Sequence, residues 1–149
     1  VVVWRHLQST LGRASAEEVM SGRGLHNIYT ALANHASAPV VFTEPAQITD
    51  AALNGTCKIA EATLTQFCRI MGSFAGNLAL NMATTGGIFI GGGIANRFPE
   101  FIQNSDFRAR FEAKGQMKHY VKDIPTYLIA EPDHGLLGAA AYLNQNTAS

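Results

Sequence analysis

Apolar residues recur at helical spacing along most of the chain, and this spacing predicts a helix-rich fold. Residues 1–12 carry the first such pattern, which Gly12 ends as a candidate C-cap. The longest pattern runs over residues 56–83. Shorter helices are predicted at residues 25–32, 49–55, 98–101, 107–111 and 135–143, whereas residues 116–121 are predicted to be polar surface.

Helix starts are marked by polar side chains that can accept hydrogen bonds from free backbone N–H groups. Ser15 and Glu18 have the spacing of a capping box, so a short helix is expected to begin at Ser15. Residues 21–24, with two glycines, are expected to interrupt this helix. Thr49–Asp50 and Asp133 are the expected caps of the helices that follow them.

The helix over residues 56–83 is expected to bury one stripe of side chains. The predicted stripe consists of Ala60, Leu64, Phe67, Cys68, Met71, Ala75, Leu78 and Met82. A row of small residues lets a neighbouring backbone approach, and is formed by Gly72, Ala75, Gly76 and Ala79. Such rows also occur in membrane helix dimers, but Lys58, Glu61 and Arg69 exclude a membrane span. The row is therefore expected to pack closely on a sheet.

Two stretches lack helical periodicity and predict strands. Ile88–Ile90 is a continuous apolar run after two glycines, which indicates a strand buried on both faces. Residues 125–130 are rich in β-branched and aromatic side chains and predict a second strand. The fold class is therefore α/β, helix-rich with a small sheet. Because two strands alone are marginally stable, we expect part of the sheet to lie outside these residues.

Composition favours a globular domain or a piece of one. Hydrophobic residues make up 47% of the chain and charged residues 15%, which favours a packed core over disorder. Lys+Arg and Asp+Glu number 11 each, without a basic cluster, so nucleic-acid binding is not expected. No apolar run approaches the roughly 20 residues of a membrane span. The chain opens on Val1 inside apolar sequence, and we interpret it as part of a longer protein.

The two cysteines indicate a reducing compartment. Cys57 and Cys68 lie in one predicted helix, where a rise of about 1.5 Å per residue separates them by roughly 16 Å. A disulfide requires Cα atoms within about 7 Å of each other. Both cysteines are therefore expected to be reduced thiols of a cytoplasmic protein.

The strongest candidate for a binding site is the glycine run after the first strand. Gly91, Gly92 and Gly93 follow Ile88–Ile90 at the strand end where ligands bind in open α/β sheets. Glycine backbone can approach a flat ligand or a phosphate closely. No Lys-Ser/Thr pair follows, which excludes a P-loop, and Asn96 replaces the third glycine of the dinucleotide fingerprint. A tight strand-to-helix turn explains the three glycines equally well.

Fewer signals point to chemistry elsewhere in the chain. Glu17 is an acidic residue in the first turn of a predicted helix, where it either favours the helix dipole or accepts hydrogen bonds from sugar hydroxyls. Spacing alone does not choose between these roles. The five histidines show no paired spacing, so no metal site is expected. Neither a serine elbow nor a Cys–His dyad is apparent, and no residue is assigned a catalytic role.

Several blocks of sequence, in order, resemble bacterial glucokinases. Residues 15–25 are similar to the segment that follows the sugar-binding loop of that family. Residues 67–81 resemble its long helix, and residues 86–94 resemble its adenosine-side strand and loop. The match covers nearly the whole chain and continues through residues 107–109, 123–125 and 135–138.

The resemblance implies an actin-like, ribonuclease-H-like kinase, with residues 1–149 as the carboxyl-terminal part of its large domain. It implies that the full-length protein phosphorylates glucose at the 6-hydroxyl with ATP and Mg²⁺. Glu17 matches the family's glutamate at the sugar hydroxyls near the anomeric carbon. Gly91, Gly92 and Gly93 match the loop against which adenosine packs. Glucose and ATP are the implied partners, and a homodimer is compatible with the family.

Other parts of the family's site have no counterpart in this sequence. They are the Asp-x-Gly-Gly-Thr phosphate loop, the catalytic aspartate, the second phosphate turn and the Glu-Gly-Gly-His sugar motif. All precede the position of Val1 in the family's order, so the amino-terminal domain is expected to be absent and the chain inactive by itself. Two alternatives remain open. One is a related kinase for another hexose or an amino sugar, and the other is a non-catalytic, sugar-responsive repressor.

Overall fold

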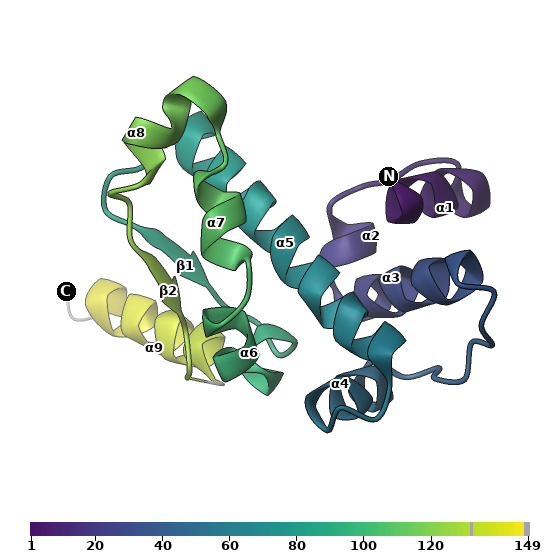
Figure 1. The fold of residues 1–149 in the computed structure, drawn as a ribbon. Coiled ribbons are helices and arrows are strands. Elements are labelled where there is room, and N and C mark those ends of the chain that lie inside the picture. The colour runs from purple at the N-terminus through teal and green to yellow at the C-terminus, as the bar shows by residue number, and fades with distance from the viewer. Residues whose placement is uncertain (132, 148–149) are drawn as a thin grey trace.

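The computed structural model describes residues 1–131 and 133–147, and one long helix runs through its centre (Figure 1). This helix, α5 (Lys58–Asn81), separates two groups of elements. The first group comprises α1 (Val2–Leu11), α2 (Glu17–Met20), α3 (Gly22–His35) and α4 (Pro45–Leu53). The second comprises strands β1 (Ile88–Ile90) and β2 (Thr126–Leu128) with α6 (Pro99–Gln103), α7 (Phe107–Glu112), α8 (Lys118–Val121) and α9 (His134–Thr147). The predicted helix-rich α/β fold with a small sheet is confirmed.

The core is one cluster of buried side chains gathered around α5. Leu25 and Ile28 of α3 pack into it from one side, and Phe111 of α7 packs into it from the other. Leu64 and Phe67 of α5 lie between them. The two groups of elements thus share a single core, and α5 is the wall common to both.

The first two helix boundaries differ in how they are capped. Gly12 ends α1 with a φ of 72°, and its N–H donates to Gln8 O, as its position in the sequence predicts. The capping box predicted at Ser15 and Glu18 is wrong, because α2 begins at Glu17 without a side-chain cap.

The cap belongs to α3 instead. Ser21 Oγ accepts a hydrogen bond from the Gly24 N–H at 3.1 Å, so residues 21–24 start a helix and do not merely interrupt one. The cap predicted at Thr49–Asp50 is also wrong, since both residues lie inside α4. There Gln47 Oε1 accepts a hydrogen bond from the backbone N–H of Glu44 at 3.1 Å. For both α3 and α4, the capping residues differ from those that the sequence predicts.

Replacing Ser21 with alanine should test this assignment. The free energy of unfolding should fall by about 1 kcal/mol, because the first turn of α3 loses its side-chain acceptor. Ser15→Ala is the matched control and should change stability by no more than a few tenths of a kcal/mol. Urea titrations followed by circular dichroism measure both variants. A larger loss for Ser15→Ala than for Ser21→Ala would restore the first assignment.

The buried stripe of α5 follows the prediction only as far as Ala75. Beyond it, Leu78 is 40% exposed and Met82 is 74% exposed, although both were predicted to be in the core. Gly76 and Ala79 are buried in their place. The stripe therefore turns toward the side on which α7 lies.

The row of small residues packs against α7 and not, as predicted, against the sheet. A Cβ on Gly72 would overlap the carbonyl oxygen of Phe107, and a Cβ on Gly76 would overlap the carbonyl oxygen of Phe111. Glycine at these two positions lets the backbones of α5 and α7 meet. Among the described residues, no helix has the length and apolarity that crossing a membrane requires.

The segment predicted as polar surface at residues 116–121 is partly wrong, because it contains α8 and contributes to the core. Val121 is fully buried. Arg108 of α7 holds the segment that follows, since its Nη1 donates to Ile124 O at 2.7 Å and its Nη2 donates to Lys122 O at 2.6 Å. These bonds fix the chain just before β2.

Strands β1 and β2 lie where the sequence predicts strands, and the structure pairs them in a two-stranded parallel sheet. Ile88 pairs with Thr126, and Ile90 pairs with Leu128. The Ile129 N–H extends the ladder by donating to Ile90 O at 2.8 Å. Parallel strands end at the same edge of a sheet, so the segments that follow β1 and β2 meet there.

The prediction that β1 is buried on both faces is wrong. Phe89 is 66% exposed and stacks on Tyr127 of β2, with ring centroids 5.0 Å apart. Ile88 and Ile90 pack on the core from the opposite face. None of the described side chains of α9 (His134–Thr147) is buried, so this helix does not cover the sheet with a packed face. Within the described residues, nothing covers the face that carries Phe89 and Tyr127.

Candidate functional site

Glu17 begins α2, and its side chain is exposed. Its backbone carbonyl accepts a hydrogen bond from Ser21 Oγ at 2.8 Å, whereas its carboxylate has no hydrogen-bonding or ionic partner among residues 1–131 and 133–147. A helix of four residues has a weak dipole, so the dipole alone gives little reason for an acid there. The carboxylate is available to accept hydrogen bonds from a ligand.

The neighbouring Glu18 holds α2 in place on α3. Its side chain is 12% exposed and pairs with Arg23 Nη2 at 3.0 Å. Asn27 Nδ2 donates to the Glu18 backbone oxygen at 2.9 Å. The backbones of α2 and α3 lie so close together that a Cβ on Gly24 would lie 2.7 Å from Val19 Cα. These contacts hold the backbone of α2, on which Glu17 lies, against α3. The Glu17 side chain itself takes part in none of them.

The three glycines after β1 differ in what surrounds them. A Cβ on Gly91 would lie 3.2 Å from His134 Nε2 and 3.3 Å from Ile129 Cδ1. A Cβ on Gly92 or Gly93 would meet no atom of the described chain within 4 Å. Gly92 has a φ of 122°, which favours glycine, whereas Gly93 does not have a positive φ. Of the three, only Gly91 would bring an added Cβ close to other described atoms, while Gly92 and Gly93 face open space.

His134 is a residue of this site that the sequence analysis missed. It follows β2 at the start of α9, and its Nδ1 lies 2.8 Å from the backbone oxygen of Glu131. The residue is half-buried, and Nε2, the other ring nitrogen, faces Gly91. Histidine spacing gave no signal, but the parallel pairing of β1 and β2 places the segments after both strands at one edge.

The loop after the glycines also reaches the segment that carries Glu17. A Cβ on Gly22, the first residue of α3, would lie 3.6 Å from Ile94 Cδ1 and 3.6 Å from Pro45 Cγ. Ile94 follows Gly93 directly, and α3 follows α2 after a single residue. The structure thus brings together the two predicted site segments, through Ile94 and Gly22, without a contact between Glu17 and the glycines.

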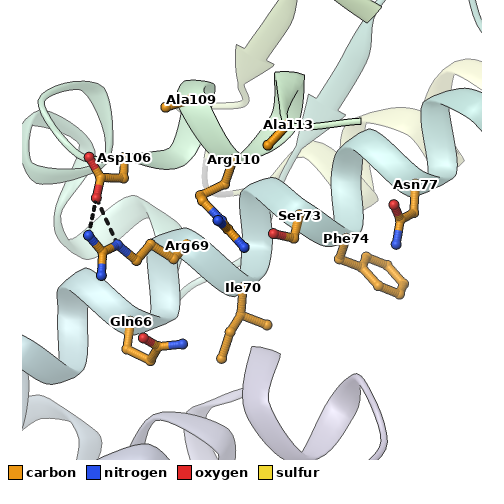
Figure 2. A pocket seen from close by; sticks show the side chains of 10 residues that line it. All are labelled: Gln66, Arg69, Ile70, Ser73, Phe74, Asn77, Asp106, Ala109, Arg110 and Ala113. Atoms are coloured by element: carbon orange, nitrogen blue, oxygen red, sulfur yellow. Dashed lines mark hydrogen bonds and ion pairs between the residues drawn. The ribbon is translucent and has the colours of Figure 1, made fainter. Parts of the chain in front are cut away.

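A separate hollow of about 760 Å³ lies between α5 and α7 (Figure 2). Arg69 Nε donates to Asp106 Oδ2 at 2.7 Å across it, and Arg110 points from α7 toward α5. Burial, with the nearby charge of Arg110, lowers the pKa of Lys114, whose Nζ donates to Ser73 O at 2.7 Å. Neither Glu17 nor the glycines line this hollow. Its polar contacts tie the two helices together, and we assign it no chemistry.

The described residues contain no group of three or more His, Cys, Asp and Glu side chains that could hold a metal ion. Cys57 and Cys68 are both free thiols, as predicted. Burial raises the pKa of the Cys68 thiol to about 11, so this group stays protonated and unreactive near neutral pH. Cys68 is therefore a core side chain and not a candidate nucleophile.

Comparison with known families assigns the chain to one of them. Residues 1–146 match the family model described as Glucokinase. The chain belongs to the glucokinase family. The resemblance inferred from the ordered sequence blocks is thereby confirmed over almost the full chain.

Glucokinases of several bacteria are close relatives of the chain. It is 50% identical to the glucokinase of Pectobacterium atrosepticum over 139 residues, which cover 93% of the chain and 43% of the relative. It is 47% identical to that of Colwellia psychrerythraea over 150 residues, covering 97% of the chain and 46% of the relative. The glucokinase of Escherichia coli K12 is 47% identical over 144 residues, which cover 97% of the chain and 45% of the relative.

A crystal structure of glucokinase from an Antarctic psychrotroph has the same architecture. The TM-score is 0.88 at 38% sequence identity, with 97% of this chain and 45% of that chain covered. The chain therefore spans less than half the length of the glucokinases it matches.

Proposed function

We propose that the chain is part of an ATP-dependent glucose kinase, in which it binds one side of the sugar and the adenosine side of the nucleotide. The family match over residues 1–146 carries the proposal. The exposed carboxylate of Glu17 and the open space at Gly92 and Gly93 support it, since each is available to a ligand.

Each segment has a distinct role in this proposal. The Glu17 carboxylate accepts hydrogen bonds from the sugar hydroxyls near the anomeric carbon, and so orients glucose with its 6-hydroxyl toward the nucleotide. Adenosine packs on the backbone of Gly92 and Gly93, where no side chain occupies the space. Gly91 lies beside His134, and its lack of a side chain leaves room for the imidazole ring.

The reacting groups of the proposed enzyme belong to other segments. In kinases of this type an aspartate accepts the proton of the sugar hydroxyl while metal and backbone amides stabilise the transferring phosphoryl group. The sequence has no counterpart of the family's phosphate loop or catalytic aspartate, so we propose that the chain alone does not phosphorylate glucose. The described residues offer no cluster for the Mg²⁺ that accompanies ATP, and we assign it no ligand here.

The proposal also covers the setting of the enzyme. We assign the chain to the carboxyl-terminal part of an actin-like large domain, on the resemblance and on the match to a glucokinase structure. A cytoplasmic location accords with two free thiols. Glucose and ATP are its proposed partners, and a homodimer remains part of the proposal.

Gly93→Val tests the nucleotide side. The test protein is a chimera in which the chain replaces its matching region in the Pectobacterium atrosepticum glucokinase. The unsubstituted chimera should phosphorylate glucose with ATP. Gly93→Val should raise the KM for ATP about tenfold or more and leave the KM for glucose within about twofold, because the new side chain fills space that adenosine needs.

Gly93 is the informative position because it tolerates a side chain in the protein itself. Its φ is not positive and its Cβ meets no described atom within 4 Å, whereas any side chain at Gly92 would strain a φ of 122°. Gly86→Val, also at an open glycine, is the control and should leave both KM values unchanged. An inactive chimera, or equal effects of Gly93→Val on ATP and glucose, would count against the proposed function.

A further inference from the structure

His134 presents one ring nitrogen to the glycine loop. Its Nε2 lies 3.2 Å from the position that a Cβ on Gly91 would occupy, so the ring edge borders the loop directly. His134 and Gly91 come from segments that follow β2 and β1, the two strands of the parallel sheet. Ligands of open α/β sheets bind beyond this strand edge. The imidazole is therefore placed at the border of the proposed adenosine site.

The backbone determines which nitrogen of His134 carries the proton. Nδ1 lies 2.8 Å from the Glu131 carbonyl oxygen, and a carbonyl oxygen can only accept a hydrogen bond. Nδ1 is therefore the donor, and in the neutral ring Nε2 is an acceptor. Within the part of the chain that the structure describes, Nε2 has no hydrogen-bond partner. The hydrogen bond of Nδ1 therefore orients the ring, and the lone pair of Nε2 is available to a ligand.

We propose that His134 Nε2 accepts a hydrogen bond from a donor group of the nucleoside that binds at Gly92 and Gly93. The inference rests on the proposed function, because it takes adenosine as the occupant of the loop. Adenosine carries such donors at its ribose hydroxyls and at the exocyclic amino group of its base. His134 acts as a specificity-determining residue and takes no part in the phosphoryl transfer.

Binding of ADP to the chain, placed within its chimera with the Pectobacterium atrosepticum glucokinase, tests the proposal without any need for activity. Backbone amide NMR shifts measure the binding. Removing the donor that His134 recognises should weaken binding roughly 3- to 10-fold, the range of a neutral hydrogen bond. 2′,3′-Dideoxy-ADP lacks the ribose hydroxyls, and inosine diphosphate lacks the amino group. One of these analogues should therefore bind more weakly than ADP to the unsubstituted chain.

Two variants distinguish the role of Nδ1 as a donor from the role of Nε2 as an acceptor. His134→Asn keeps a donor for Glu131 O but loses the acceptor at the Nε2 position, so it should bind ADP and the discriminating analogue equally. His134→Gln places an amide oxygen near the Nε2 position and should regain part of the preference for ADP. Thermal unfolding of both variants checks that the loop remains folded.

The outcomes distinguish this inference from the function on which it rests. If the unsubstituted chain and His134→Asn showed the same preference for ADP over the discriminating analogue, the role of His134 would be overturned and the proposed function would stand. If either variant bound ADP and both analogues more weakly by the same factor, the role of His134 would also be overturned, since that pattern reflects general damage to the loop. Failure of the unsubstituted chain to bind ADP would overturn the inference together with the adenosine assignment at the glycine loop.

Discussion

Gly72→Ala should lower the free energy of unfolding by about 2 kcal/mol or more. In an open helix the same change stabilises by about 1 kcal/mol, because alanine is the better helix former. At Gly72, however, the added Cβ would overlap the Phe107 carbonyl oxygen and lie 2.9 Å from its carbon. Backbone atoms cannot rotate away as a side chain does, so α7 must shift on α5, with the strain of an overpacked core. Urea titration measures the change.

Gly138→Ala is the matched control, since it makes the same substitution inside helix α9. A Cβ there meets no described atom within 4 Å. This variant should be neutral or stabilised by up to about 1 kcal/mol. If Gly72→Ala were as well tolerated as Gly138→Ala, the close approach of α5 and α7 would be wrong.

The second large effect is expected at Glu17, in the chimera with the Pectobacterium atrosepticum glucokinase. Glu17→Gln should raise the KM for glucose tenfold or more and leave the KM for ATP within about twofold. The substitution keeps the size of the side chain but replaces one carboxylate oxygen with a donor, and charged hydrogen bonds contribute about 1.5–3 kcal/mol. Steady-state kinetics with each substrate varied in turn measure both constants.

Glu18→Gln provides a control from the same turn of α2. Glu18 is nearly buried and pairs with Arg23, so this variant should lose some thermal stability. Its KM for glucose should change by less than about threefold, because the side chain faces α3 and not a ligand. Similar rises in KM for both variants would show that damage to α2, and not the Glu17 carboxylate, weakens sugar binding.

Two local patterns in the sequence predicted the structure correctly. Gly12 has the spacing of a C-cap and is one, and the run Ile88–Ile90 forms a strand. N-terminal caps were less predictable, because Ser15 and Ser21 both precede helical sequence and only Ser21 accepts a hydrogen bond from the helix that follows it. The Glu18 side chain pairs with Arg23 and is not available to complete a box with Ser15.

Properties that depend on distant contacts could not be predicted from spacing. The burial of Gly76 in place of Leu78 follows from where α7 packs, which periodicity in α5 does not encode. For the candidate site, Glu17 and the glycines were proposed from resemblance, and their ligands remain predictions. His134 was missed because its position beside Gly91 arises from strand pairing and not from any local motif.

The parallel pairing of β1 with β2 also bears on the order in which the chain folds. The segment between the two strands contains α6, α7 and α8, so pairing the strands closes a long loop at a cost in conformational entropy. The contacts of α2 with α3 and of α4 with α5 join helices that are neighbours in the sequence and can form sooner. The edge that brings Gly91 to His134 should accordingly be among the last parts of the molecule to become structured.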